Sequence, residues 1–129
     1  MPFIAKVQVD GEEMNILHCS FRLSQATDTT GKPTAIPMGG SVTLVVESNG
    51  TTGMFDWMVS PTQTKSGIIT FYRRDTLSKL KTLQFIDAHC VDYYETFDHN
   101  GESPMQVQIT LSAKEIKLNE SQFKNNWPE

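Results

Sequence analysis

Three shortages limit what this chain of 129 residues can be: few cysteines, no long apolar run and no clustered positive charge. Two cysteines, Cys19 and Cys90, are too few for the disulfide framework of a small secreted protein. Two interpretations stay open: both are structural thiols, or they form one isolated disulfide. No stretch approaches the ~20 apolar residues of a membrane-spanning helix, so we expect no membrane insertion. The N-terminus has no basic segment followed by an apolar block, so we expect any export to proceed without a signal peptide.

The charge balance argues against nucleic acid as a partner. The chain has 15 acidic and 11 basic residues, and its net charge is −4. Only Arg73 and Arg74 are adjacent in an otherwise scattered set of basic residues, whereas phosphate binding favours clustered Lys and Arg. Tyr93 and Tyr94 are neighbours on a predicted strand and therefore lie on opposite faces, so they form no stacking platform.

Catalytic and metal-binding signatures are also missing. The sequence contains no Gly-rich phosphate loop, nucleophile elbow or zinc-protease helix. His18-Cys19 and His89-Cys90 resemble zinc ligands, but neighbouring side chains on a strand point to opposite faces and cannot easily converge on one ion. Cys19 lies on an apolar face, where a thiol is inert. We therefore expect no enzyme activity, no metal and no cofactor.

The clearest positive signal is a long antiparallel hairpin near the C-terminal end. From Met105 to Lys114, apolar and polar residues alternate strictly, which is the pattern of a half-buried strand. The preceding segment, residues 83–97, is rich in aromatic and β-branched residues. Asn100-Gly101 between the two segments tolerates positive φ. The two segments are therefore predicted to pair.

The remaining patterns predict a mainly β fold. We expect further strands at residues 3–9, 14–25, 41–48 and 68–73, the second with Leu17, Cys19, Phe21 and Leu23 facing inward. Residues 119–129 are polar apart from Phe123 and Trp127. Strands joined by turns, with no βαβ character, predict a small antiparallel β-barrel of two packed sheets with six to seven or more strands. Residues 1–129 are expected to form a single domain.

One short helix is predicted at residues 51–60, where Met54, Trp57 and Met58 follow helical spacing and Phe55 widens the apolar stripe. A helix this short depends on packing for its stability. We expect Met54, Phe55, Trp57 and Met58 to plug an open end of the barrel. The alternative is a lid over a cofactor.

Residues 26–40 are predicted to form a long loop. They include threonines, glycines, Pro33 and Pro37, with almost no large apolar residue. A loop of this length in a compact domain is uncommon. Two interpretations are open: a flexible surface excursion, or an arm that becomes ordered against a neighbouring subunit.

A set of short motifs, spread in order over nearly the whole chain, resembles the haemolysin-coregulated protein family (Hcp, also called TssD), and specifically its divergent TssD-type branch. The motifs are Leu17-His18-Cys19, Gly39-Gly40, Leu44-Val45-Val46-Glu47-Ser48, Phe55-Asp56-Trp57-Met58, Lys65-Ser66-Gly67-Ile68-Ile69-Thr70-Phe71, Arg74-Asp75, Leu83-Gln84-Phe85-Ile86-Asp87-Ala88-His89-Cys90-Val91, Phe97-Asp98 with Gly101, Pro104-Met105, Thr110-Leu111-Ser112-Ala113 and Trp127-Pro128. All of them are scaffold residues, and none is catalytic.

The resemblance implies a function. The chain would be the tube subunit of a type VI secretion system: a homo-hexameric ring that stacks into a tube, propelled by a contractile sheath behind a spike protein, with effector proteins carried in its lumen. It would assemble in the bacterial cytoplasm and be secreted to the exterior or into a target cell. The resemblance suggests that the long loop reaches the adjacent ring, which makes Asp28, Thr30, Gly31, Lys32, Pro33 and Thr34 the candidates for ring stacking.

Two alternatives are kept beside this interpretation. A tube protein of a contractile phage tail or phage-like particle would share fold and assembly, and its gene neighbours would distinguish it. A monomeric ligand-binding β-barrel would have a similar apolar interior, and a monomeric mass with a ligand-dependent thermal shift would favour it.

Overall fold

A computed structural model describes residues 3–34, 37–73, 75–76, 78–102, 104–125 and 127. Arg74 and Pro128 of the quoted motifs, and residues 35 and 36 of the predicted loop, lie outside this part of the chain. The elements follow in the order β1 (Phe3–Val9), β2 (Glu12–Ser24), β3 (Met38–Glu47), α1 (Gly53–Val59), β4 (Lys65–Arg73), β5 (Lys79–Phe97), β6 (Met105–Leu118) and β7 (Ser121–Lys124).

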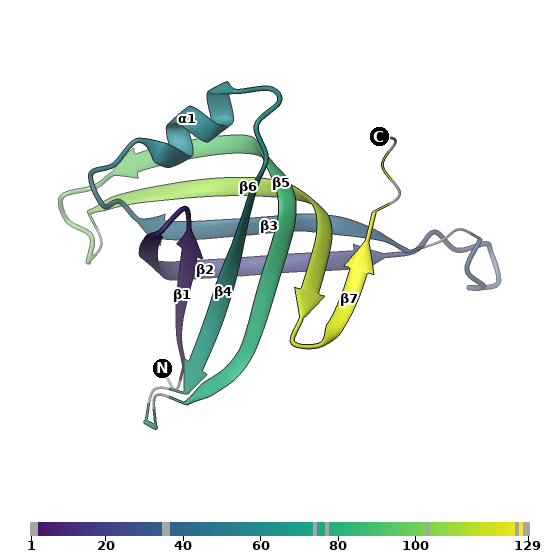
Figure 1. Ribbon diagram of the computed structural model, residues 1–129. Helices are drawn as coiled ribbons and strands as arrows, with labels where there is room; N and C mark the ends of the chain where they lie inside the picture. The colour runs from purple at the N-terminus through teal and green to yellow at the C-terminus, as the bar shows by residue number, and fades with distance from the viewer. Residues whose placement is uncertain are drawn as a thin grey trace.

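The strands form one antiparallel sheet that closes on itself. Its order is β3-β2-β1-β4-β5-β6-β7, and a further pairing of β3 with β6 completes a barrel (Figure 1). The predicted mainly β barrel with one short helix is confirmed. The structure adds β7, which the polar composition of residues 119–129 did not indicate. The sequence places Phe123 there, and its backbone pairs with Ile116 of β6.

Two long strands, β2 and β5, each bend and belong to both sides of the barrel (Figure 1). Register shifts accompany the change of partner: one lies between Ile16 and His18 in β2, and the other is where Lys65 and Gly67 pair with Ala88 and Phe85 of β5, around Asp87 with φ +51°. An extra residue in one strand bends it locally and lets a sheet turn a corner. Residues 89–97 of β5, 105–112 of β6, β3 and 16–24 of β2 therefore form one side, called here the four-stranded wall.

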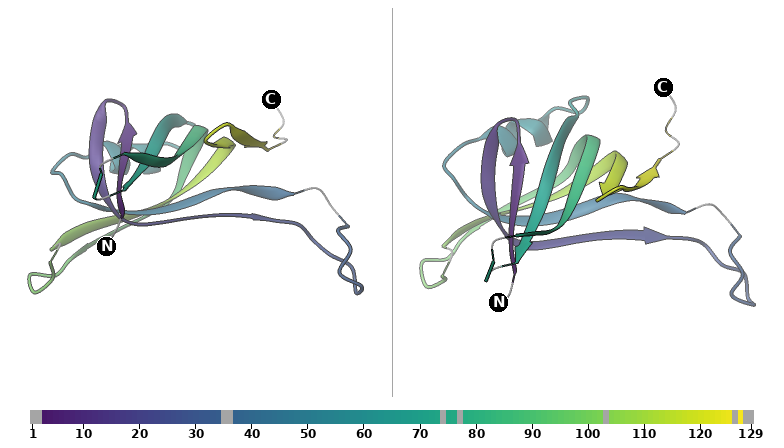
Figure 2. Two further views of the ribbon diagram at one scale, coloured as in Figure 1. Left: turned by 90° about the horizontal axis from the view of Figure 1, so that it is seen from below. Right: turned by 60° about the horizontal axis from the view of Figure 1, so that its bottom comes forward.

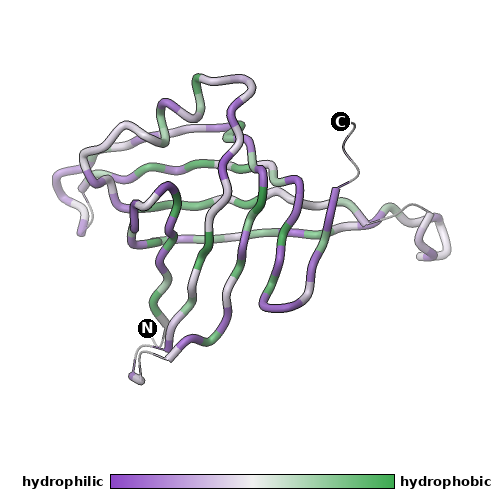
Figure 3. The backbone as a smooth tube through the Cα atoms, viewed as in Figure 1, coloured by the Kyte–Doolittle hydropathy of each residue, from purple (hydrophilic) through white to green (hydrophobic). Residues whose placement is uncertain are grey.

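The core lies between the two sides, and strand alternation fills it. Four residues of β6 predicted to face inward from its period of two, Val107, Ile109, Leu111 and Ala113, are buried, whereas Met105 is 46% exposed at the start of the strand. The alternation changes phase after Ala113, so that Ile116 is also buried. β3 contributes Val42, Leu44 and Val46, which face the same interior. In β3 and β6 every second residue is buried over most of the strand, and hydrophobic and hydrophilic residues alternate along the backbone (Figure 3).

Helix α1 is anchored by Trp57. This side chain is fully buried, its ring stacks on that of Phe85 with centroids 6.4 Å apart, and its Nε1–H donates to the Gln63 carbonyl at 3.2 Å. Met54 and Met58 are partly buried against the core. Phe55 differs from the expectation: it is 51% exposed, and its ring packs edge-on against Tyr93 of β5 instead of entering the core. The helix is also shorter than residues 51–60, since Ser60 is already extended.

Two further expectations need correction. The inward face predicted for β2 is covered only in part: Leu17 is 39% exposed, Phe21 38% and Leu23 55%. Cys19 and Phe21 pair with Leu44 and Val42 of β3 and so face the barrel side. At this end of β2, however, the rest of the barrel covers the inward side chains only in part. The long loop is shorter than residues 26–40, because β3 begins at Met38 and continues the ladder with β2.

Candidate assembly surfaces

Residues 25–34, called here the arm, project from the end of the β2–β3 ladder away from the barrel (Figure 2). All of these residues are exposed. The arm has a folded tip of its own: Thr27 and Pro33 form an isolated antiparallel bridge, and the Thr34 amide donates to the Ala26 carbonyl at 2.9 Å. At the turn, Gly31 has φ +88°, a left-handed conformation that glycine adopts without steric cost.

Asp28 organises this tip. Its Oδ1 accepts hydrogen bonds from the Thr30 amide at 2.9 Å, the Thr30 hydroxyl at 2.7 Å and the Lys32 amide at 3.0 Å. These bonds favour the charged carboxylate and lower the pKa of Asp28, with the Thr30 side-chain bond as the largest cause. The structure thus brings Asp28, Thr30, Gly31, Lys32, Pro33 and Thr34 together in one small hairpin.

The root of the arm is fixed to the barrel by Asn125, a residue that the sequence analysis did not single out. Its side-chain amide donates to the Gly39 carbonyl at 2.9 Å and to the Ala113 carbonyl at 2.8 Å. Gly40 has φ +93°, and a Cβ there would lie 2.5 Å from the Ala113 carbonyl oxygen. The quoted Gly39-Gly40 motif therefore marks the point where β3 passes close to β6 and the C-terminal segment.

The four-stranded wall has two open edges. Residues 16–24 of β2 pair with β3 on one side, and among the described residues no strand pairs with their other side. Residues 89–97 of β5 likewise pair with β6 alone, again within the described part of the chain. Unpaired N–H and C=O groups along a strand edge are a template for pairing with another chain.

The outer face of the wall is mainly polar, although one of its rows contains Val45 and the exposed Tyr94. Backbone pairing joins Ser20, Thr43, Thr110 and Asp92 in one row across the four strands, and Arg22, Ser41, Ser112 and His89 in the next. The opposite face of the same strands carries the buried core. The wall therefore presents hydroxyl, amide and charged groups to whatever lies outside it.

The described residues offer little for catalysis. Both cysteines are free, and burial raises the pKa of the Cys19 thiol to about 11 and also raises that of Cys90. Both thiols are therefore protonated and weakly nucleophilic near neutral pH. Burial, followed by the 2.9 Å hydrogen bond to Glu95, raises the pKa of Tyr93 to about 12. No group of three or more His, Cys, Asp or Glu residues within the described part of the chain is placed to hold a metal ion.

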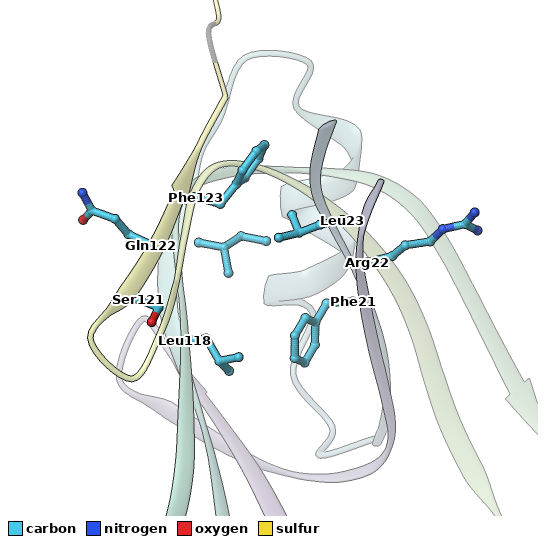
Figure 4. A pocket seen from close by; sticks show the side chains of 8 residues that line it. Phe21, Arg22, Leu23, Leu118, Ser121, Gln122 and Phe123 are labelled. Atoms are coloured by element: carbon cyan, nitrogen blue, oxygen red, sulfur yellow. The ribbon is translucent and has the colours of Figure 1, made fainter. Parts of the chain in front are cut away.

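An apolar pocket of about 360 Å³ opens at one end of the barrel (Figure 4). Phe21 and Leu23 of β2 form one side of it, and Leu118 and Phe123 of β6 and β7 form the other. The Arg22 side chain points away from this cavity, as strand alternation requires (Figure 4). The partly uncovered face of β2 thus borders a hollow rather than a packed core.

Comparison with known proteins decides the family. The family model described as hemolysin coregulated protein Hcp (TssD) matches residues 1–128. The chain belongs to the Hcp (TssD) family. The structure of Hcp1 from Flavobacterium johnsoniae is 36% identical in sequence, with 95% of this chain and 99% of that chain covered and a TM-score of 0.90. No curated protein matches.

More distant structures share the fold. Hcp1 from Salmonella typhimurium is 13% identical over 95% of this chain and 92% of its own, with a TM-score of 0.76. The sheath/tube terminator of an extracellular contractile injection system, PVC, is 21% identical over 89% of this chain and 92% of its own, with a TM-score of 0.58. As an Hcp protein, the chain is a tube component of a type VI secretion system. Hcp is a secreted structural component of that system. None of the described helices is long and apolar enough to cross a membrane.

Proposed function

We propose that this Hcp protein forms hexameric rings by pairing the β2 edge of each four-stranded wall with the β5 edge of the next. The observation that carries the proposal is the pair of open edges on opposite sides of the wall. A closed ring leaves no free edge, which removes the risk of uncontrolled strand pairing.

The strand directions are compatible with this junction. All neighbouring strands in the wall are antiparallel, and their order is β5-β6-β3-β2. With four strands, the two edge strands run in opposite directions. Rotation about a ring axis preserves the direction of each strand, so the β5 edge of one copy meets the β2 edge of the next in antiparallel orientation. The ring then continues one sheet around a central channel.

The polar face of the wall would line that channel. The barrel core occupies the other face of the same strands, so the rows containing Thr43 and Thr110 are available to the lumen. A surface rich in hydroxyl and amide groups can hydrogen-bond to folded proteins without a strong preference for one sign of charge. Effector proteins in the lumen are the cargo that this lining suits.

The arm is proposed as the stacking element that reaches the adjacent ring. It is fully exposed, it is folded by its own hydrogen bonds around Asp28, and it projects beyond the barrel (Figure 2). A preformed tip loses less conformational entropy on binding than a flexible loop. Stacked rings would form the tube that the sheath propels behind the spike, after assembly in the bacterial cytoplasm. In this proposal the chain is not an enzyme.

The test is native mass spectrometry with electron microscopy of purified protein at micromolar concentration. We expect annular particles of about 87 kDa, six times the chain mass of 14.5 kDa. A variant in which an Asn-Gly turn replaces residues 28–32 should form the same rings but no stacks. Wild-type protein that remains monomeric at every concentration would refute the ring, and stacks of the tip-less variant would refute the role of the arm.

A further inference from the structure

Two exposed apolar surfaces lie beside the two open edges of the wall. The first, called here the helix ridge, consists of Phe55, Val59 and Val91, which are 51%, 63% and 52% exposed. Phe55 packs edge-on against Tyr93 of β5, with ring centroids 5.6 Å apart. Val59 and Val91 border one hollow beside Cys90. The ridge therefore flanks the β5 edge.

The second surface, called here the β2 stripe, consists of Phe21 and Leu23, which are 38% and 55% exposed, together with the half-buried Cys19. These residues belong to the β2 edge and face the barrel side of the wall, where Phe21 and Leu23 border the apolar pocket (Figure 4). The helix ridge is on the same side of the wall, because Tyr93, its contact, pairs with the buried Ile109. Both surfaces thus lie outside the proposed channel, at opposite edges.

We propose that the helix ridge of each copy packs on the β2 stripe of the next copy in the ring. The inference rests on the proposed edge-to-edge assembly and names the side-chain contact that accompanies it. Helix α1 would then contact two cores: Trp57 fills its own barrel, while Phe55 and Val59 cover the uncovered stripe of the neighbour. The contact is heterologous, because the two surfaces that meet are different.

Backbone pairing within one wall supports this alignment. One row joins Tyr93, Ile109, Leu44 and Cys19, and the next joins Cys90, Leu111, Val42 and Phe21. Continued without an offset, these rows would bring Tyr93 and Cys90 of a second copy next to Cys19 and Phe21 of the first. The shear needed to close a barrel sets the offset along the strands. At any such offset, pairing of the two edges places the helix ridge and the β2 stripe on the same side of one continuous sheet, at the same junction.

Charge favours a second copy of this chain as the occupant. Residues 89–97 of β5 carry Asp92 and Glu95 and no Lys or Arg, and α1 adds Asp56. Residues 16–24 of β2 carry Arg22 and no acidic residue. An acidic edge and a basic edge on opposite sides attract each other in a head-to-tail ring and disfavour pairing of two like edges.

Cross-linking tests the contact directly. In a background with Cys19→Ser and Cys90→Ser, one sample carries Val59→Cys and a differently tagged sample carries Leu23→Cys. After mixing and reassembly, a short bis-maleimide should join the two tags covalently and should give little product in either sample alone. Abundant dimers within the Val59→Cys sample alone would indicate a symmetric contact and overturn the inference.

A substitution pair adds a second measurement. Val59→Glu should lower the fraction of rings in native mass spectra at least tenfold and leave the circular dichroism spectrum of the monomer unchanged. Leu80→Glu is the control, because Leu80 is an exposed apolar residue of β5 outside the wall, 37% exposed, and it should leave ring formation unchanged.

The outcomes separate this inference from the proposed function. If wild type forms rings but the mixed sample does not cross-link and Val59→Glu still forms rings, the ridge-to-stripe contact is wrong while the ring stands. If wild type forms no rings, the edge-to-edge assembly itself fails. If a small apolar molecule copurifies in the pocket of Phe21 and Leu23 and blocks cross-linking without disrupting rings, the pocket belongs to a ligand and the inference fails.

Discussion

The barrel and the arm reach order by different means. In the barrel, Trp57, Phe85 and the alternating residues of β3 and β6 are held by burial of apolar surface between strands that are distant in sequence. In the arm, all residues are exposed, and the tip is held by short-range hydrogen bonds to Asp28 and by one bridge. The barrel can therefore supply the stability of the protein, while the arm supplies a shaped surface and little stability.

This difference separates folding from assembly. Residues of the arm can change without loss of the core, and residues of the core can change only at a cost in free energy of unfolding. The wall lies between these extremes, because its inner face is core and its edges are unpaired. Substitutions in the barrel should thus act mainly on stability, and substitutions at the tip of the arm mainly on assembly. Substitutions at the root of the arm should act on both stability and assembly.

The largest expected effect is at Trp57. Trp57→Ala removes a fully buried ring that stacks on Phe85, so we expect the free energy of unfolding to fall by about 3–5 kcal/mol. Urea denaturation at fixed protein concentration measures it. The control is Phe97→Ala, since Phe97 is 67% exposed and should cost far less. Equal losses for the two variants would contradict the role of Trp57 as the anchor of α1.

A smaller effect is expected at the root of the arm. Gly40→Ala places a Cβ 2.5 Å from the Ala113 carbonyl oxygen at a φ of +93°, so β3 must shift from β6. We expect a loss of about 1–3 kcal/mol in the free energy of unfolding, together with weaker ring stacking because the arm is displaced. Gly50→Ala is the control for positive φ alone, since a Cβ there meets no atom within 4 Å. A loss no greater than that of Gly50→Ala would show that the close approach to Ala113 is unimportant.

The smallest effect on stability is expected at Asp28, and it should depend on pH. Asp28→Ala should leave barrel unfolding unchanged and weaken stacking in light scattering. Because hydrogen bonds lower the pKa of Asp28 in the folded tip, the tip is stabilised above the ordinary pKa of 3.8 and loosens as pH falls through the lower folded value. Hydrogen exchange at the Thr30 and Lys32 amides, corrected for the intrinsic pH dependence of exchange, should report this.

Asp28→Asn is the matched control, since its side-chain oxygen still accepts hydrogen bonds but does not titrate over this range. Its corrected protection should therefore be independent of pH. If wild type shows the same independence, the charged carboxylate is not what holds the tip.

Much of the fold could be predicted because strand alternation is local. The period of two in residues 105–114 depends on neighbours in sequence and is found in the structure. A turn also joins the two strands, closed by the Gly101 amide donating to the Asp98 carbonyl, but neither Asn100 nor Gly101 has positive φ. Burial is not local in this way. Phe55 and Phe21 follow apolar patterns as regular as those of Trp57 and Leu44. Nothing in these patterns shows that Phe55 and Phe21 stay partly exposed because other elements of the chain do not cover them fully.

The candidate surfaces were predicted less completely. The arm stood out because residues 26–40 have almost no large apolar residue, although the sequence could not show that Asp28 folds the tip. Nothing in the sequence indicated the open edges of β2 and β5, because an edge exists only where no neighbouring strand pairs with that side of the strand. Asn125 also had none, because its two acceptors, the carbonyls of Gly39 and Ala113, come together only when the barrel closes.

By itself, the order of residues determined strands β1 to β6, the helix around Trp57, the polar arm and membership of the Hcp family, because these depend on local spacing and on motifs in a fixed order. Only the tertiary structure decided that β2 and β5 end as opposite open edges of one wall, with the helix ridge beside one and the β2 stripe beside the other. Strand pairing and side-chain burial arise from contacts between residues far apart in the chain. The local spacing of apolar residues therefore cannot show which strand edge is left without a partner.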